Sequence, residues 1–167
     1  MILLKKNNTQ IKQIVNSKEK KNKTTQKVNH ILGFIAADHA GYELKEYLKE
    51  KFAFIDLGTF NDSSVDYPDY AKKLCKYVLK EKSMGILICG TGIGMSIAAN
   101  RNKKIRAALC NDVGVAELAR LHNDANVLVL GGRVTKPSEA EKIVKRFFDA
   151  KFSNEDRHKR RIQKLDK

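Results

Sequence analysis

The chain has 167 residues, a net charge of +14 and three cysteines. The length suits one domain with a sizeable core, and no apolar run approaches the length of a membrane span. Three cysteines without a C-x-x-C pair exclude a disulfide framework and a zinc ribbon, and they favour a reducing compartment such as the cytoplasm.

Most of the positive charge lies at the two ends of the chain. Residues 1–29 hold eight lysines against Glu19, giving +7, and residues 151–167 hold seven basic residues against three acidic ones, giving +4. The part between them therefore carries only +3. Residues 1–29 are also rich in Asn, Gln and Thr, a composition that buries too little apolar surface to fold. We expect a disordered extension over 1–29, a folded domain over 30–167, and neither a nucleic acid nor a membrane as partner.

The first part of the folded sequence alternates apolar runs with amphipathic segments. After the first run, Leu44, Tyr47 and Leu48 recur at the spacing of one helix face. The pattern predicts, in chain order, a strand over Ile31–Ala36, a helix over Tyr42–Lys51, a strand over Phe52–Leu57, a polar loop over Thr59–Asp69 and a helix over Tyr70–Lys82.

The central stretch consists of a short apolar run, a glycine loop and the start of a helix. Gly85–Ile88 suits a strand buried on both faces, and Cys89 ends it. The loop Gly90–Gly94 holds three glycines, which let bare backbone N–H groups turn toward a ligand, and a helix begins near Met95. Such an arrangement forms an anion or oxyanion site, and a helix N-terminus favours the thiolate form of Cys89.

The remaining chain repeats the alternation of strand and helix. Pro137, Ser138 and Glu141 have the spacing of a capping box, which marks the start of a helix. The pattern predicts a strand over Ile105–Cys110, a helix over Gly114–Leu121, a strand over Val127–Leu130, a helix over Pro137–Ala150 and a last helix that carries Arg157 and Arg161.

Strands that alternate with helices through short loops predict an α/β fold: a three-layer αβα sandwich around a five-stranded parallel, Rossmann-like sheet. The carboxyl ends of parallel strands meet at one edge, where open α/β sheets bind their ligands. Polar side chains that follow the strands should gather at this edge, and they are Asp38, His39, Cys89, Asn111, Asp112 and Arg133.

Other interpretations stay open at this point. The glycine loop is similar to a dinucleotide fingerprint, although its third glycine would fall on Met95, and Asp112 could stand for the ribose-binding acid. A nucleotide- or nucleic-acid-binding protein is therefore an alternative. A metal site formed by Asp38, His39 and His122 matches no familiar ligand spacing.

The two other cysteines and two of the histidines are interpreted as structural residues. Cys75 and Cys110 are interpreted as core residues, since free cysteines are mostly small buried hydrophobes. His30 and His158 are interpreted as capping or surface histidines.

Six short motifs occur in order over residues 31–165: Ala37–Gly41, Asp66–Pro68, Ile88–Ser96, Arg120–Asn126, Gly132–Val134 and Arg157-His158 with Arg161. Together they resemble the ribose-5-phosphate isomerase B family, which includes the galactose-6-phosphate isomerase subunits. The resemblance implies interconversion of D-ribose 5-phosphate and D-ribulose 5-phosphate, a step of the pentose phosphate pathway, with neither metal nor cofactor.

The resemblance also implies roles for individual residues. Cys89 would be the base that moves a proton between C2 and C1, and His122 would open the sugar ring. Thr91 and the loop N–H groups would hold the negative charge of the enediolate. Arginines would bind the phosphate in a fixed geometry. The implied substrate-binding residues are Asp38, His39, Gly90, Gly92, Ile93, Gly94, Asn123, Arg133, Arg157 and Arg161.

Sites of the family combine residues from two subunits, so the resemblance implies a homodimer or a dimer of dimers with shared active sites. Cys89 and both tail arginines are present on one chain, which favours copies of the same chain as partners. A six-carbon sugar phosphate, galactose 6-phosphate or allose 6-phosphate, is an alternative substrate, because the length of the pocket cannot be seen in the sequence.

Overall fold

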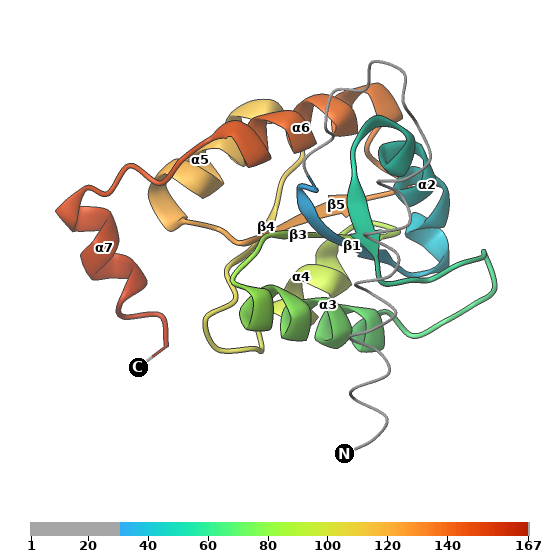
Figure 1. The fold of residues 1–167 in the computed structure, drawn as a ribbon, viewed down its shortest axis with the longest axis horizontal. Helices are drawn as coiled ribbons and strands as arrows, with labels where there is room; N and C mark the ends of the chain where they lie inside the picture. Colours follow the sequence, from blue (N-terminus) through green and yellow to red (C-terminus); the bar gives the residue numbers. More distant parts are fainter. Residues whose placement is uncertain (1–30, 167) are drawn as a thin grey trace, which may run out of the picture.

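The computed structural model describes residues 31–166. The extension predicted over 1–29 and the residue His30 lie outside the described residues. Within the described part, five strands form one sheet in the order β2-β1-β3-β5-β4, and all neighbouring strands are parallel (Figure 1). The strands are β1 (Gly33–Ala37), β2 (Phe54–Asp56), β3 (Gly85–Cys89), β4 (Ala107–Leu109) and β5 (Val127–Gly131).

Helices cover both faces of the sheet, which confirms the predicted αβα sandwich (Figure 1). One layer holds α2 (Tyr42–Lys51), α5 (Val113–Asn123) and α6 (Pro137–Asp149), and the other holds α3 (Tyr67–Glu81) and α4 (Ile93–Ala99). A 3₁₀ turn, η1 (His39–Gly41), follows β1, and the last helix, α7 (Asp156–Ile162), lies beside α5. None of the described helices has the length and apolar character that a membrane crossing requires.

Alternate residues of the central strand β3 pack into opposite helix layers. Ile86 and Ile88 belong to the core that contains α2 and α6, whereas Leu87 and Cys89 belong to the core that contains α3 and α4. Every residue of β3 is buried. This burial on both faces explains why the strand reads as a continuous apolar run.

Most predicted elements are present with shifted ends. Helix α3 begins at Tyr67 rather than Tyr70, because Pro68 fits the first turn of a helix, where its missing N–H has no partner to lose. Helix α5 continues through Asn123, which places His122 in its last turn. Strands β2 and β4, at the two edges of the sheet, are shorter than predicted.

The capping box predicted at the start of α6 is wrong. Pro137 takes the first helical position, so Lys136 is the N-cap, and no side chain caps the helix. Ser138 therefore lies inside the first turn, and Glu141 turns to a neighbouring helix instead. Its Oε2 accepts a hydrogen bond from the hydroxyl of Tyr47 on α2 at 3.0 Å, which raises the pKa of that hydroxyl.

Candidate functional site

Cys89 lies at the carboxyl end of β3, where its sulfur meets the glycine loop. The backbone N–H of Gly92 donates to Cys89 Sγ at 3.2 Å, and the residue is 5% exposed. Two residues after Cys89, Thr91 Oγ1 accepts from the N–H of Ile93 at 3.4 Å, at the start of α4. The glycine loop therefore directs one of its backbone amides at the sulfur.

Gly92 occupies a position that only glycine fits without strain. Its φ is +82°, in the left-handed region that side chains with a Cβ rarely adopt. A Cβ there would also lie 3.2 Å from the backbone carbonyl of Leu130 and would clash with the side chain of Leu109. The loop therefore lies directly on β4 and β5, and its geometry depends on this residue.

Two backbone hydrogen bonds join the loop after β5 to the loop after β3. Gly132 N–H donates to Cys89 O at 2.7 Å, and Arg133 N–H donates to Gly90 O at 2.9 Å. A Cβ on Gly90 would lie 3.5 Å from Cδ and Nη1 of Arg133, so the guanidinium lies against the bare backbone of the loop. The positive charge of Arg133 is thus held against Gly90, the residue that follows Cys89.

Asp38 and His39 bring the loop after β1 to the same edge. Asp38 Oδ1 accepts from the N–H of Ala40 at 2.9 Å and of Gly41 at 3.1 Å, and so caps η1. His39 Nδ1 accepts from the N–H of Val65 at 3.3 Å, which leaves Nε2 as the protonated nitrogen of the neutral ring. The turn after β1 therefore presents an imidazole N–H donor.

An open cleft of about 400 Å³ lies next to this turn. It is lined by two carboxylates, a phenol, an ammonium group and one apolar residue: Asp66, Asp69, Tyr70, Lys73 and Val65. Val65 is the residue whose amide binds His39. Cys89 is not part of the lining. The cleft offers hydrogen-bond partners to a polar ligand beside the Asp38–His39 turn.

The residues predicted to form one site lie, within one chain, at two opposite edges of the sheet. Cys89 ends β3, and a five-residue strand advances about 13 Å. His122 and Asn123 end α5, after which the chain enters the amino end of β5. There the N–H of Gly85, the first residue of β3, donates to Asn126 O at 3.0 Å. The end of α5 is therefore at the amino edge, away from the sulfur.

The two tail arginines, Arg157 and Arg161, also lie at the amino edge. Both are on α7, which stands away from the sheet beside the end of α5 (Figure 1). The N–H of Lys104, shortly before β4, donates to Asp166 Oδ2 at 2.9 Å and holds the end of the tail there. Within one chain, the predicted phosphate-binding set is thus divided between Arg133 and α7.

His158 is buried, so its interpretation as a capping or surface histidine is wrong. It is 4% exposed and stacks on His122, with the ring centroids 4.4 Å apart. Its Nε2 has no hydrogen-bond partner among the described residues, and Glu155 Oε1 is 3.9 Å away. Burial and the positive charge of Arg157 hold the pKa of His158 below its usual value. No local sequence pattern signals this pairing, because it arises only when α7 returns to α5.

A cluster of charges fixes the turn that carries His122 and Asn123. Asp124 accepts from Arg106 Nη2 and from Arg120 Nη1, each at 2.8 Å. Arg106 Nε also donates to Asn123 O at 2.9 Å. The end of α5 is therefore held by two guanidinium groups, one from its own helix and one from the segment before β4.

Large apolar side chains are exposed around the glycine loop and on α5. Those that flank the edge strand β4 and the site loops are Ile93 and Ile97 on α4, Val115 and Leu118 on α5, and Val134 after β5. Exposed apolar side chains that gather into a surface patch mark contact sites for other protein chains.

Comparison with known proteins decides between an isomerase and a nucleotide-binding protein. A sequence model described as Ribose/Galactose Isomerase matches residues 34–165. The chain belongs to the ribose/galactose isomerase family. The resemblance seen in the six sequence motifs is thereby confirmed, and the protein is an isomerase.

Relatives and solved structures agree with the family. The chain is 41% identical over 134 residues to ribose-5-phosphate isomerase B of Escherichia coli. The aligned region covers 77% of this chain and 89% of the relative. A Rickettsia bellii protein, named as a sugar phosphate isomerase with no sugar specified, is 50% identical over 138 residues and matches 79% of this chain and 95% of its own length. The crystal structure of a ribose 5-phosphate isomerase from Thermotoga maritima has a TM-score of 0.78 and 50% identity, covering 82% of this chain and 98% of that structure.

Features that favoured other functions have structural roles in this isomerase. Asp112 Oδ1 accepts from the N–H of Val115 at 2.9 Å, so this carboxylate caps the start of α5. Cys75 and Cys110 are core residues as predicted, and burial raises the pKa of both thiols to about 12. Both thiols therefore stay protonated at neutral pH. Among residues 31–166, no three His, Cys, Asp or Glu side chains gather as metal ligands.

Proposed function

We propose that the protein interconverts D-ribose 5-phosphate and D-ribulose 5-phosphate in the cytoplasm, as part of the pentose phosphate pathway. The observation that carries the proposal is the sulfur of Cys89, in contact with the Gly92 amide, in a loop whose Gly90 backbone lies against Arg133. Relatives named as ribose-5-phosphate isomerases support the choice of sugar. The unpaired cysteines favour a reducing compartment.

The reaction requires a base that takes a proton from C2 and returns it to C1. In this proposal the Cys89 thiolate removes the C2 proton of the open-chain aldose, and the electron pair of that bond forms the enediolate. The thiol then protonates C1, while the hydroxyl proton on O2 passes to O1. All atoms of the sugar are retained, so no co-reactant is needed.

The enediolate carries negative charge that must be stabilised by donors already in place. Thr91 and the N–H groups of the loop Gly90–Gly94, including that of Ile93, would supply them. Removing one such donor typically lowers the rate by about 10²–10³-fold. The close contact of Gly92 with β5 supports this role, because it holds the loop in a single geometry.

The other residues would open the ring and bind the substrate. An imidazole that changes its charge near neutral pH suits the proton transfers of ring opening, a task we assign to His122 in contact with His158. Asp38 and Asn123 would bind sugar hydroxyls. The phosphate would be bound by guanidinium groups together with an imidazole: Arg133, Arg157, Arg161 and His39.

We infer that a complete site contains two copies of the chain. One copy would supply the carboxyl edge with Cys89, and the other would supply the amino edge with His122 and α7, because one chain holds these groups at opposite edges of the sheet. The exposed apolar side chains of α4 and α5 offer the surface for such a contact. A homodimer, alone or paired into a dimer of dimers, meets this requirement.

A six-carbon sugar phosphate is the second candidate substrate. The matching family model is described for both ribose and galactose, and the Rickettsia bellii relative has a name without a specified sugar. Galactose 6-phosphate and allose 6-phosphate would use the same thiol, loop and arginines, with one more hydroxyl group to accommodate.

Turnover by the purified full-length chain tests the proposal. Ribose 5-phosphate should be converted faster than galactose 6-phosphate or allose 6-phosphate. Cys89→Ala should lose about 10³-fold or more in rate, whereas Cys75→Ala, which removes a buried core thiol, should keep its activity. Absence of turnover with every sugar phosphate, or an active Cys89→Ala variant, would overturn the proposal.

A further inference from the structure

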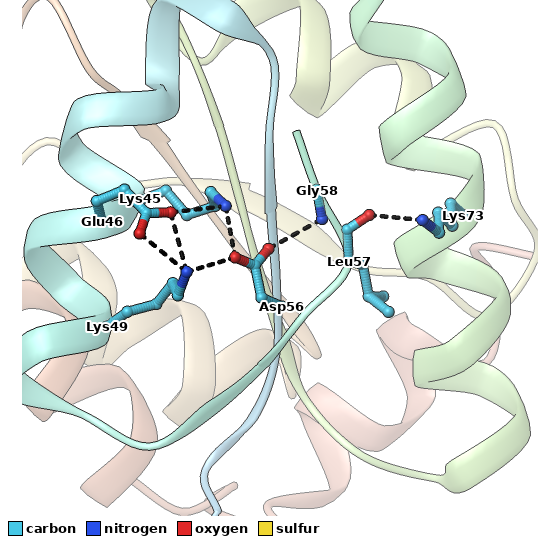
Figure 2. A network of polar contacts seen from close by, with 7 residues as sticks. All are labelled: Lys45, Glu46, Lys49, Asp56, Leu57, Gly58 and Lys73. Carbon is cyan, nitrogen blue, oxygen red and sulfur yellow. Dashed lines mark hydrogen bonds and ion pairs between the residues drawn. The ribbon is translucent and has the colours of Figure 1, made fainter. Parts of the chain in front are cut away.

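A lysine is fully buried beside the edge strand β2. Lys45, on α2, is 0% exposed, and its Nζ lies 2.6 Å from Asp56 Oδ2 and 2.9 Å from Glu46 Oε1 (Figure 2). Lys49 Nζ contacts the same two carboxylates, at 2.6 and 2.9 Å. Replacing a buried ion pair by apolar residues is often neutral or stabilising, so stability alone does not explain its presence.

The second oxygen of Asp56 connects this cluster to the carboxyl end of β1. Asp56 Oδ1 accepts from the N–H of Gly58 at 2.9 Å. Gly58 O accepts from the N–H of Ala37 at 2.7 Å, and Thr59 N–H donates to Ala37 O at 2.8 Å. Ala37 is followed directly by Asp38. A continuous series of hydrogen bonds therefore runs from the buried ammonium to the turn that carries Asp38 and its neighbour.

The same loop is attached on its other side to α3 and to the site. Lys73 Nζ, on α3, donates to Leu57 O at 2.7 Å (Figure 2). Further along, the N–H of Val65 donates to His39 Nδ1 at 3.3 Å. The loop between β2 and α3 is thus held from both helix layers, and it contacts the imidazole proposed to bind the phosphate.

We propose that Lys45 and Asp56 are positioning residues for substrate binding: they fix the β2–α3 loop, and through it the turn that carries Asp38 and His39. The inference rests on the proposed function, in which this turn binds the sugar phosphate. Cys89 and its glycine loop are not part of this series of hydrogen bonds. Loosening the cluster should therefore weaken substrate binding more than it slows the proton transfer.

Lys45→Met tests this role, because methionine fills a similar length without charge. We expect KM for the sugar phosphate to rise about tenfold and kcat to change less than twofold. Lys142→Met is the matched control, since it removes an exposed lysine paired with Glu139 on α6, and it should leave both constants unchanged. An unchanged KM in Lys45→Met would overturn the proposal. A fall in kcat as large as the rise in KM would overturn it as well.

Amide hydrogen exchange supplies a readout that does not depend on turnover. In Lys45→Met, the amides of Ala37 and Thr59 should exchange at least about tenfold faster, while that of Leu128 in β5 should keep its protection. An equal loss of protection at Ala37, Thr59 and Leu128, or no loss of protection at any of them, would contradict a local role. If the wild-type chain converts no sugar phosphate, the proposed function is wrong. Amide exchange in Lys45→Met would still show whether Lys45 fixes the turn that carries Asp38 and His39.

A second variant covers the case in which Lys45→Met does not fold. Asp56→Asn keeps an oxygen acceptor for the Gly58 amide but loses the charge that pairs with the lysines. It should show the same rise in KM and the same faster exchange at Ala37 and Thr59. A folded Asp56→Asn variant with wild-type KM would overturn the proposal.

Discussion

The imidazole rings of His122 and His158 stack with their centroids 4.4 Å apart and an interplanar angle of 14°. The contact joins the last turn of α5 to α7 and buries His158 almost completely. Two histidines from distant parts of the chain therefore act as one unit at the amino edge. The proposal that this pair opens the sugar ring can be tested by comparing the two directions of the reaction.

His122→Asn should slow the conversion of ribose 5-phosphate by about 10²-fold, the lower end of what a general acid–base group contributes. At saturating substrate, kcat for ribulose 5-phosphate should fall less, because a 2-ketose phosphorylated on O5 cannot form a five-membered ring and needs no opening. The comparison uses kcat in each direction, since the equilibrium constant fixes the ratio of the two kcat/KM values.

His158→Phe is the companion variant, since it keeps a ring for stacking but has no titratable nitrogen. It should show the same asymmetry between directions to a smaller extent. Equal losses of kcat in both directions for His122→Asn would remove these histidines from ring opening and leave them a general role in binding or folding.

Acid should weaken the folded state through His158. Burial and the positive charges of Arg157 and His122 hold its pKa below the ordinary value of 6.5. Between the two pKa values the unfolded chain binds the proton more readily than the folded one, so stability rises with pH in this window. The stability that depends on a neutral His158 is fully present above the pKa that this residue has in the unfolded chain. It is lost as the pH falls below that value.

Urea unfolding at about pH 7.5 and about pH 5.5 measures this effect. Wild type should be less stable at the lower pH, and His158→Gln should show a smaller difference between the two conditions, because glutamine does not titrate. His158→Gln with the full wild-type difference would assign the acid sensitivity to other groups. Carboxylates with a lowered pKa, such as Asp56, lose their contribution only at more acidic pH.

Two inactive variants should restore activity when they are mixed. In a mixed dimer of Cys89→Ala and Arg161→Ala chains, both changes fall into one shared site, and the other site is intact. Random exchange of subunits should therefore recover about one quarter of the wild-type rate. The measurement is turnover of ribose 5-phosphate after the two purified variants have been exchanged and reassembled.

The control pairs two changes from the same edge. Cys89→Ala mixed with Arg133→Ala places one defect in each site of the mixed dimer, so no activity should return. Recovery in neither mixture would contradict a site shared between copies, since each chain would then have to complete its own site.

The carboxyl edge of the sheet could be predicted from the sequence because it depends on local order. Strand, polar residue and glycine follow one another along the chain, so the positions of Asp38, Cys89 and Arg133 follow from the parallel sheet alone. The buried pairing of Lys45 with Asp56 could not be predicted, because a lysine on an amphipathic helix normally faces solvent.

The amino edge was harder to predict because it depends on tertiary contacts. The sequence places His122 near the end of a helix without giving its edge of the sheet; α5 runs antiparallel to the strands and carries its end to the edge opposite Cys89. The stacking of His158 depends on the return of α7. The predicted capping box is absent because Pro137 takes the first helical position, so Lys136 and not Ser138 is the N-cap.

Gly92→Ala should lower both stability and turnover. The left-handed φ of +82° and the backbone of Leu130 at 3.2 Å from a Cβ should cost about 1–3 kcal/mol in unfolding free energy. Because the Gly92 N–H also contacts the Cys89 sulfur, the rate should fall by more than the folded fraction does.

Gly114→Ala is the matched control for this change. Gly114 lies in the first turn of α5, where an added Cβ would meet only the carboxylate of Asp112 at 3.3 Å. Alanine in a helix is favoured over glycine, so this variant should be equally stable or up to about 1 kcal/mol more stable. Urea midpoints and turnover of both variants provide the measurements. A stable Gly92→Ala variant with full activity would show that the loop does not require its left-handed residue, and the proposed oxyanion site would lose its geometric basis.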